Sequence, residues 1–222
     1  MNRLFLLDAM ALIYRAYYAM ANNQRMTSKG FNTSASFGFI NYLYDLLQKE
    51  KPTHIAVCID SIVPTFRHEE FEAYKANREK MPEDIATNIP YIKRIVSAFN
   101  IQLVECPGYE ADDLIGTIAK KASKLGSYEI FIVTPDKDLG QIVDDNIRIY
   151  KPSKGKNPHE ILDRQAVCEK FGVPDTKFVI DYLGLVGDSS DNIPGVSGVG
   201  PVAAKKLINE FGSIENLITN AD

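Results

Sequence analysis

The chain has 222 residues, 45% of them hydrophobic and 24% charged, which suits one α/β domain with a buried core and a small appendage. Its three widely spaced cysteines and three isolated histidines argue against a disulfide framework and against a zinc site. The net charge of −4 argues against a nucleic-acid partner, unless many of the acids converge on metal ions that invert the local field.

The first twelve or so residues after the start, RLFLLDAMALIY, are apolar but do not predict a membrane segment. Asp8 and Arg15 interrupt the run too early for a signal peptide or a membrane span. We therefore expect a cytoplasmic protein with no membrane partner.

Four short apolar runs predict buried strands, at 3–8, 54–60, 101–105 and 129–134. Helical patterns lie between them, at 34–50, 82–100 and 110–126. Thr33 and Ser34 stand at the start of the first of these helices and are suitable caps. The alternation predicts an α/β fold with a mostly parallel central sheet flanked by helices on both faces.

Residues 61–81 are polar, rich in cations and aromatics, and long for a connection, which is typical of a functional insertion. If the insertion is helical, Arg67, Lys75 and Arg78 share a sector of roughly 80°. Tyr74 could then stack on a base while the cations hold a phosphate. A solvated helix face with i,i+4 pairing explains the same pattern equally well.

After about residue 175 the pattern becomes a helix, a glycine-rich segment and another helix. Close-set glycines before a helix expose backbone N–H groups to a phosphate, although a tight turn without a ligand would use them too. The residues concerned are Gly195, Gly198, Gly200, Lys205 and Lys206. We expect two regions, 1–175 and 176–222.

Nine carboxylates are concentrated in short segments, most of them near the carboxyl end of a predicted strand, where ligands of such sheets bind. They are Asp8, Asp60, Glu110, Asp112, Asp113, Asp136, Asp138, Asp188 and Asp191. Mg²⁺ and Mn²⁺ prefer oxygen ligands, and two such ions about 3.5–4 Å apart can drive phosphodiester hydrolysis. The acids therefore predict a metal site; solvated surface acids are the alternative.

The strings PGYEADDLIG, DKDL, YKANR and GDSSDNIPGVSGVG resemble the 5′-nuclease family of flap endonucleases and 5′-3′ exonucleases. Within the family, the chain is most similar to the N-terminal 5′-nuclease domain of bacterial DNA polymerase I. The resemblance runs from Asp8 to about Leu217. It implies a PIN-like core, an arch or gateway at about 61–81, and a C-terminal helix–three-turn–helix element.

The resemblance implies hydrolysis of DNA at 5′ flaps, nicks and 5′ ends, with two or more Mg²⁺ or Mn²⁺ ions. The first metal group would be served by Asp8, Asp60, Glu110 and Asp112, and the second by Asp113, Asp136, Asp138, Asp188 and Asp191. By the same resemblance, Lys75 would contact the scissile phosphate, with Arg78 assisting it and Tyr74 stacking on the displaced base.

The helix–three-turn–helix element would grip the duplex backbone without reading its sequence, with a K⁺ ion at its loop carbonyls. Thr33 and Ser34 would hold another phosphate, unless they only cap a helix. Two departures from the family pattern stand out: Val202-Ala203 replace a usual Lys-Thr pair, and Pro135 replaces a usual glycine.

The family domain normally continues beyond this element, so we expect either a truncated nuclease part of DNA polymerase I, with the polymerase in the same full-length chain, or a free-standing flap endonuclease. A monomer is expected in both cases. A PIN-type ribonuclease and a DNA-binding module without catalysis are the other candidates. The arch argues against the first, and the complete acid set argues against the second.

Overall fold

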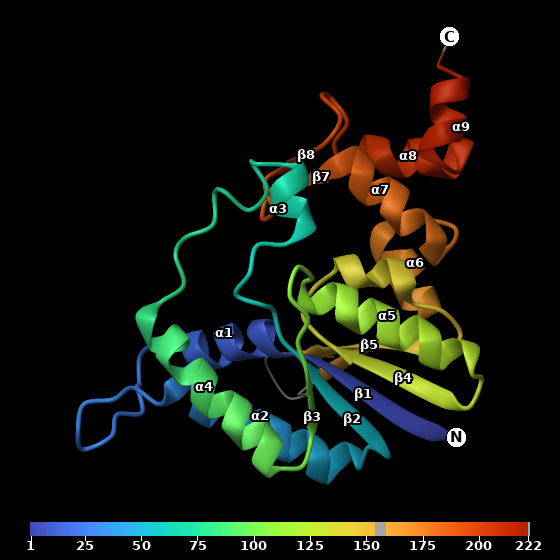
Figure 1. Cartoon of the computed structure of the whole chain (residues 1–222). Helices are drawn as coiled ribbons and strands as arrows, with labels where there is room; N and C mark the ends of the chain where they lie inside the picture. Colours follow the sequence, from blue (N-terminus) through green and yellow to red (C-terminus); the bar gives the residue numbers. More distant parts are fainter. Residues whose placement is uncertain (154–158, 222) are drawn as a thin grey trace.

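The computed structural model describes residues 1–153 and 159–221 and is built on a six-stranded sheet (Figure 1). The strand order is β3-β2-β1-β4-β5-β6, with β6 antiparallel to β5 and the other neighbours parallel. The strands are β1 (Asn2–Asp8), β2 (His54–Cys58), β3 (Gln102–Val104), β4 (Tyr128–Val133), β5 (Ile147–Pro152) and β6 (His159–Leu162). The predicted fold class is confirmed.

Helices cover both faces of the sheet. The side chains of a strand alternate between its faces, and here both faces carry apolar side chains that must be buried. Phe5 and Leu7 of β1 pack under α1, α2 and α4, whereas Leu4 and Leu6 face α5 and α6. The helices of the first face are α1 (Ala9–Ala19), α2 (Ser34–Glu50) and α4 (Glu83–Ala98). Those of the second are α5 (Ala111–Lys124) and α6 (Arg164–Phe171). Each core is therefore closed by its own helical layer.

The chain direction across the sheet reverses between β1 and β4. From β1 the chain builds β2 and β3 on one side, then returns to add β4 and β5 on the other. At such a switch point the loops leaving the two central strands diverge and open a crevice beyond their carboxyl ends. The fold therefore places its crevice beside Asp8, the last residue of β1.

The C-terminal region is helical and extends away from the sheet (Figure 1). It contains α7 (Val179–Val186), a short hairpin of β7 (Gly187–Asp188) and β8 (Ile193–Pro194), α8 (Pro201–Phe211) and α9 (Ile214–Thr219). The hairpin requires glycine, since a Cβ on Gly187 would lie 2.3 Å from the nitrogen of Gly195. Two 3₁₀ turns, Asp138–Ile142 and Thr176–Phe178, complete the elements named here, together with α3 (Phe66–Glu70).

The 61–81 insertion is helical only over a short part of its length, so the condition set for its cations is not met. Its helix, α3, ends at Glu70, and Lys75 has a φ of 57°, in the left-handed region where a right-handed helix cannot continue. The common sector predicted for Arg67, Lys75 and Arg78 therefore does not form. The sequence prediction also missed α1, β5 and β6.

Within the described ranges 1–153 and 159–221, no helix is both long enough and apolar enough to cross a membrane.

Replacing Leu6 by alanine tests the central role of β1. Leu6 is fully buried at the middle of the central strand, so Leu6→Ala should lower the free energy of unfolding by about 2–5 kcal/mol in urea denaturation. Leu125→Ala is the matched control, because Leu125 is 71% exposed and its truncation should change stability by about 0.5 kcal/mol or less. Equal losses in the two variants would contradict this packing.

Candidate metal centre

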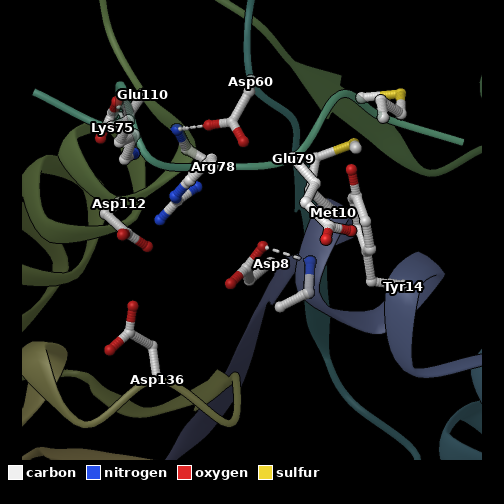
Figure 2. A pocket seen from close by; sticks show the side chains of 13 residues that line it. Asp8, Met10, Tyr14, Asp60, Lys75, Arg78, Glu79, Glu110, Asp112 and Asp136 are labelled. Atoms are coloured by element: carbon white, nitrogen blue, oxygen red, sulfur yellow. Dashed lines mark hydrogen bonds and ion pairs between the residues drawn. The ribbon is translucent and has the colours of Figure 1, made fainter. Parts of the chain in front are cut away.

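A cavity of about 450 Å³ opens at the switch point, and carboxylates from separate segments face it (Figure 2). Asp8 ends β1, Asp60 follows β2, Asp136 follows β4, and Glu110 and Asp112 stand at the start of α5. Because parallel strands all end at this edge, residues far apart in the sequence meet here. Lys75, Arg78 and Glu79 of the insertion also line the cavity.

Asp8 is the most deeply placed of these acids, with an exposed fraction of 7%. Its carboxylate accepts hydrogen bonds from the N–H of Ala11 at 3.1 Å and from the hydroxyl of Thr134 at 2.9 Å. The Thr134 contact crosses the switch point from β4 to β1. Burial raises the pKa of Asp8 to about 6, although both hydrogen bonds lower it.

Asp112 and Asp138 carry the same signature. Burial, followed by the charges of Asp8 and Asp136, raises the pKa of Asp112 to about 8. Burial, followed by the charges of Asp136 and Asp188, raises the pKa of Asp138 to about 7. One Asp138 oxygen is buried and has no hydrogen-bond partner within residues 1–153 and 159–221. These carboxyls lack a sufficient counter-charge.

The donor set fits hydrated divalent cations. In the part of the chain that the structure describes, no three histidine, cysteine, aspartate or glutamate side chains converge closely enough to hold one ion between them. Mg²⁺ keeps several of its waters and commonly takes only one or two carboxylates directly. A cavity of about 450 Å³ lined by acids can accept ions in this hydrated form, and their charge would remove the repulsion that raises the carboxyl pKa values.

The insertion places cations directly on two of the predicted ligands. The ammonium of Lys75 lies 2.7 Å from Glu110 and 3.8 Å from Asp191, and the guanidinium of Arg78 pairs with Asp191. Tyr74 donates its hydroxyl hydrogen bond to Glu110 at 2.9 Å. The distant segments at 75, 110 and 191 thus form one charged network.

Tyr74 cannot stack on a base in this conformation, which corrects the role predicted for it. Its side chain is buried, with an exposed fraction of 6%, and its ring contacts His68 at 5.1 Å. Its hydroxyl is bound to Glu110 and also to Asp191, at 3.2 Å. Here Tyr74 holds two acids of the site in place.

Arg67 and Asp113 are also placed differently from the prediction. The Arg67 guanidinium donates to both carboxylate oxygens of Asp113, at 2.8 Å each. This pairing lowers the pKa of Asp113, which also accepts a 3.0 Å hydrogen bond from the N–H of Glu110. Arg67 is thus bound to a carboxylate and not free for phosphate, and Asp113 faces Arg67.

Thr33 and Ser34 both bind Arg25, so neither caps α2 by its side chain. The Thr33 hydroxyl donates to the Arg25 carbonyl at 2.8 Å, and the Ser34 hydroxyl accepts from the Arg25 N–H at 2.8 Å. Ser34 is also only 1% exposed, which keeps it away from phosphate in this conformation.

The glycine-rich turn is accessible. Gly195, Gly198 and Gly200 are exposed before α8, and Lys206 is exposed on that helix. The Lys205 side chain instead covers Gly172, where a Cβ would lie 2.8 Å from it. Lys205 therefore contributes to packing.

Sequence reasoning missed three residues that organise the site. Thr134 fixes Asp8, Asn77 donates to the Ser189 carbonyl at 2.7 Å, and Asn192 donates to the Ala73 carbonyl at 2.8 Å. Thr134 had a detectable signal, since it follows a buried strand and stands two residues before Asp136 of the DKD motif. The two asparagines lie inside the strings YKANR and GDSSDNIPGVSGVG, but no local pattern predicts their contacts, because their partners are more than 100 residues away in the sequence.

Two family models together match almost the whole chain. The N-terminal resolvase-like domain of 5′-3′ exonuclease matches residues 3–172, and its C-terminal SAM fold matches residues 175–222. A 5′-3′ exonuclease of Aquifex aeolicus is 40% identical over 99% of this chain and 73% of its own length. DNA polymerase I of Bacillus subtilis is 41% identical over all of this chain, which spans 25% of that protein.

Solved structures show the same fold. A complex of bacteriophage T5 flap endonuclease with DNA and metal ions has a TM-score of 0.78 at 21% identity, covering 99% of this chain and 79% of that one. The catalytic core of Rad2 with a DNA substrate has a TM-score of 0.63 at 24% identity, covering 97% and 63%. The chain belongs to the 5′-3′ exonuclease family of metal-dependent nucleases.

Proposed function

We propose that this chain hydrolyses DNA phosphodiesters at 5′ flaps, nicks and 5′ ends, leaving a 5′-phosphate and a 3′-hydroxyl. The observation that carries the proposal is the convergence of Asp8, Asp60, Glu110, Asp112 and Asp136 on one cavity beside a lysine. A phosphodiester needs both features, since the acids hold cations and the lysine faces the phosphate.

We propose Mg²⁺ or Mn²⁺ as the ions. When bound, such ions supply an activated water and neutralise charge on the attacked and leaving oxygens. One or two of the cavity acids would bind one ion directly, and the others through its waters. Asp138 and Asp188, near Asp136, would hold the other ion in the same way, together with Asp191. The structure of bacteriophage T5 5′-exonuclease with bound divalent zinc ions supports divalent cations in this fold.

The side chains of the protein orient the reaction. Thr134 keeps Asp8 in the orientation that faces the cavity, and Tyr74 does the same for Glu110. Lys75 would offset charge on the scissile phosphate, assisted by Arg78. For this, metal ions must replace the two cations at Glu110 and Asp191, and the phosphate must replace the acids at Lys75 and Arg78. Asp113 is the predicted ligand with the least support, because Arg67 occupies both of its oxygens.

We propose that duplex DNA is held outside this acidic cavity, on the region 176–222, with a division from the nuclease core near residue 175. The exposed glycine turn before α8 offers backbone N–H groups, and Lys206 offers charge nearby. A K⁺ ion at the turn carbonyls, a monomeric state, a cytoplasmic location and a polymerase domain in the same full-length protein belong to the same proposal.

Asp138→Asn tests the metal-dependent mechanism. With Mg²⁺ and a 5′-flap DNA, wild type should cut near the junction of single strand and duplex, and Asp138→Asn should be slower by about 100-fold or more. DNA binding should survive, because the carboxyl contacts ions and not the duplex. Asp145→Asn is the control, since the Asp145 side chain is 85% exposed. Cutting that persists in EDTA, or strict preference for single-stranded RNA, would refute the mechanism.

Lys75→Ala tests the phosphate contact. The variant should lower kcat about 100-fold while the Kd for flap DNA changes by about threefold or less, because the contact matters most in the transition state. Lys49→Ala is the matched control, since Lys49 also forms an ion pair, with Asp45 at 3.0 Å, but on the surface of α2. An unchanged kcat would remove Lys75 from the mechanism.

The raised carboxyl pKa values predict an unusual pH dependence of stability without metal. Asp8, Asp112 and Asp138 have folded pKa values of about 6, 8 and 7, above their unfolded values, so the folded state binds more protons and loses stability as pH rises. In EDTA, Tm should fall by about 4–8 °C between about pH 6 and pH 8.5. The acids with lowered pKa values, such as Asp113, lose their contribution only below this window.

Addition of about 10 mM Mg²⁺ at the higher pH should restore most of the lost Tm, because bound cations stabilise the charged carboxylates. In EDTA, the fall in Tm with rising pH should be smaller for Asp112→Asn than for wild type. A Tm that rises with pH in EDTA would show that these acids are not destabilising one another.

A further inference from the structure

Hydrogen bonds join the insertion to the 188–192 loop, and the one made by Asn192 runs in the opposite direction to those of its neighbours. Three successive carbonyls of the loop accept hydrogen bonds from the insertion, and the donors are backbone or side-chain groups of residues 75, 77 and 78. The pairs are Asn77 Nδ2 to Ser189 O at 2.7 Å, Arg78 Nε to Ser190 O at 3.3 Å, and Lys75 N to Asp191 O at 2.9 Å.

One hydrogen bond runs in the opposite direction. The side-chain amide of Asn192 donates to the Ala73 carbonyl at 2.8 Å, two residues before Lys75. Lys75 and Asn192 are both left-handed, each with a φ of 57°. Because that conformation is unfavourable for a lysine, whereas asparagine tolerates it, surrounding contacts must hold the Lys75 backbone. The hydrogen bonds from Lys75 N to the Asp191 carbonyl and from Asn192 Nδ2 to the Ala73 carbonyl do so.

These contacts fix the position of the Lys75 backbone, and with it the origin of the side chain. With its N–H bound to Asp191 and the preceding Ala73 carbonyl bound to Asn192, the Lys75 ammonium reaches Glu110 at 2.7 Å. Asn192 itself is not among the residues that line the acidic cavity. It borders a separate hollow with Phe71 and Gly195. Asn192 can therefore act on catalysis only indirectly, through the insertion or through its chain neighbour Asp191, and its side-chain amide contacts the insertion.

We propose that Asn192 is a positioning residue for Lys75. Its amide holds the Ala73 carbonyl, and this contact keeps residues 73–78 in the conformation that directs the lysine into the site. The inference rests on the proposed function, because Lys75 acts there on the scissile phosphate. Displacing a catalytic group by about 1 Å can lower a rate about 100-fold. A distant hydrogen bond that holds the backbone of that group in position can therefore affect the rate.

Two substitutions remove the side-chain amide donor of Asn192 and still permit its backbone conformation. Asn192→Gly and Asn192→Asp both tolerate a left-handed φ and both remove the donor. Each should lower kcat on 5′-flap DNA by about 10- to 100-fold while leaving the Kd for the DNA within about threefold. Gln165→Ala is the matched control, since the Gln165 side-chain amide also donates a hydrogen bond, to Glu169 at 2.8 Å, but on α6, away from the acidic cavity and from the region 176–222.

A second measurement does not depend on catalysis. Limited trypsin digestion in EDTA without DNA, followed by mass spectrometry, reports cleavage after Lys75 and Arg78. Loss of the Asn192 hydrogen bond should accelerate these cuts about 2- to 10-fold, because the segment opens more often. Cleavage elsewhere should keep its wild-type rate, which shows that the variants are folded.

The inference requires both results. Slower turnover with unchanged trypsin cleavage, or faster cleavage with unchanged turnover, would overturn it. If wild type does not cut flap DNA at all, the proposed function fails, and the positioning role fails with it. If wild type cuts and Asn192→Gly cuts equally well, the positioning role alone fails.

Discussion

Repulsion among carboxylates at one edge of the sheet is the constraint on which the rest of this structure depends. Parallel strands that end together bring acids within reach of one another, and burial makes their charges more costly. Without metal, the protein relieves this repulsion in two ways. Asp112 retains its proton up to about pH 8. Glu110 and Asp113 instead receive cations from the insertion, Lys75 and Arg67.

The insertion is therefore part of the electrostatics of the site. Lys75 and Arg78, which would contact a phosphate, already form ion pairs with Glu110 and Asp191, which would contact metal ions. Binding of metal and DNA must therefore break these ion pairs. The acidic net charge of the chain agrees with this arrangement, because much of it belongs to a centre that cations neutralise. DNA would be held elsewhere, by backbone groups.

Sequence patterns predicted the parallel core well, because its strands are continuous apolar runs and its helices are separated by clear boundaries; the predicted helix at 34–50 matches α2. They missed α1, which continues directly from β1 without a turn signal, and β5, whose charged residues at Arg148 and Lys151 weaken the apolar pattern. Local pattern also failed for the insertion. There, tertiary hydrogen bonds to the 188–192 loop override helical propensity.

The acids of the site could be found from their places after the strands, but their partners could not. Arg67 and Asp113 are 46 residues apart, so no spacing rule joins them. If this acidic edge holds at least two divalent ions, diffraction from crystals grown with Mn²⁺ and recorded at the manganese edge should show anomalous peaks beside Asp8 and Asp112 and beside Asp138. Crystals with Mn²⁺ on surface acids but none in this cavity would contradict this proposal.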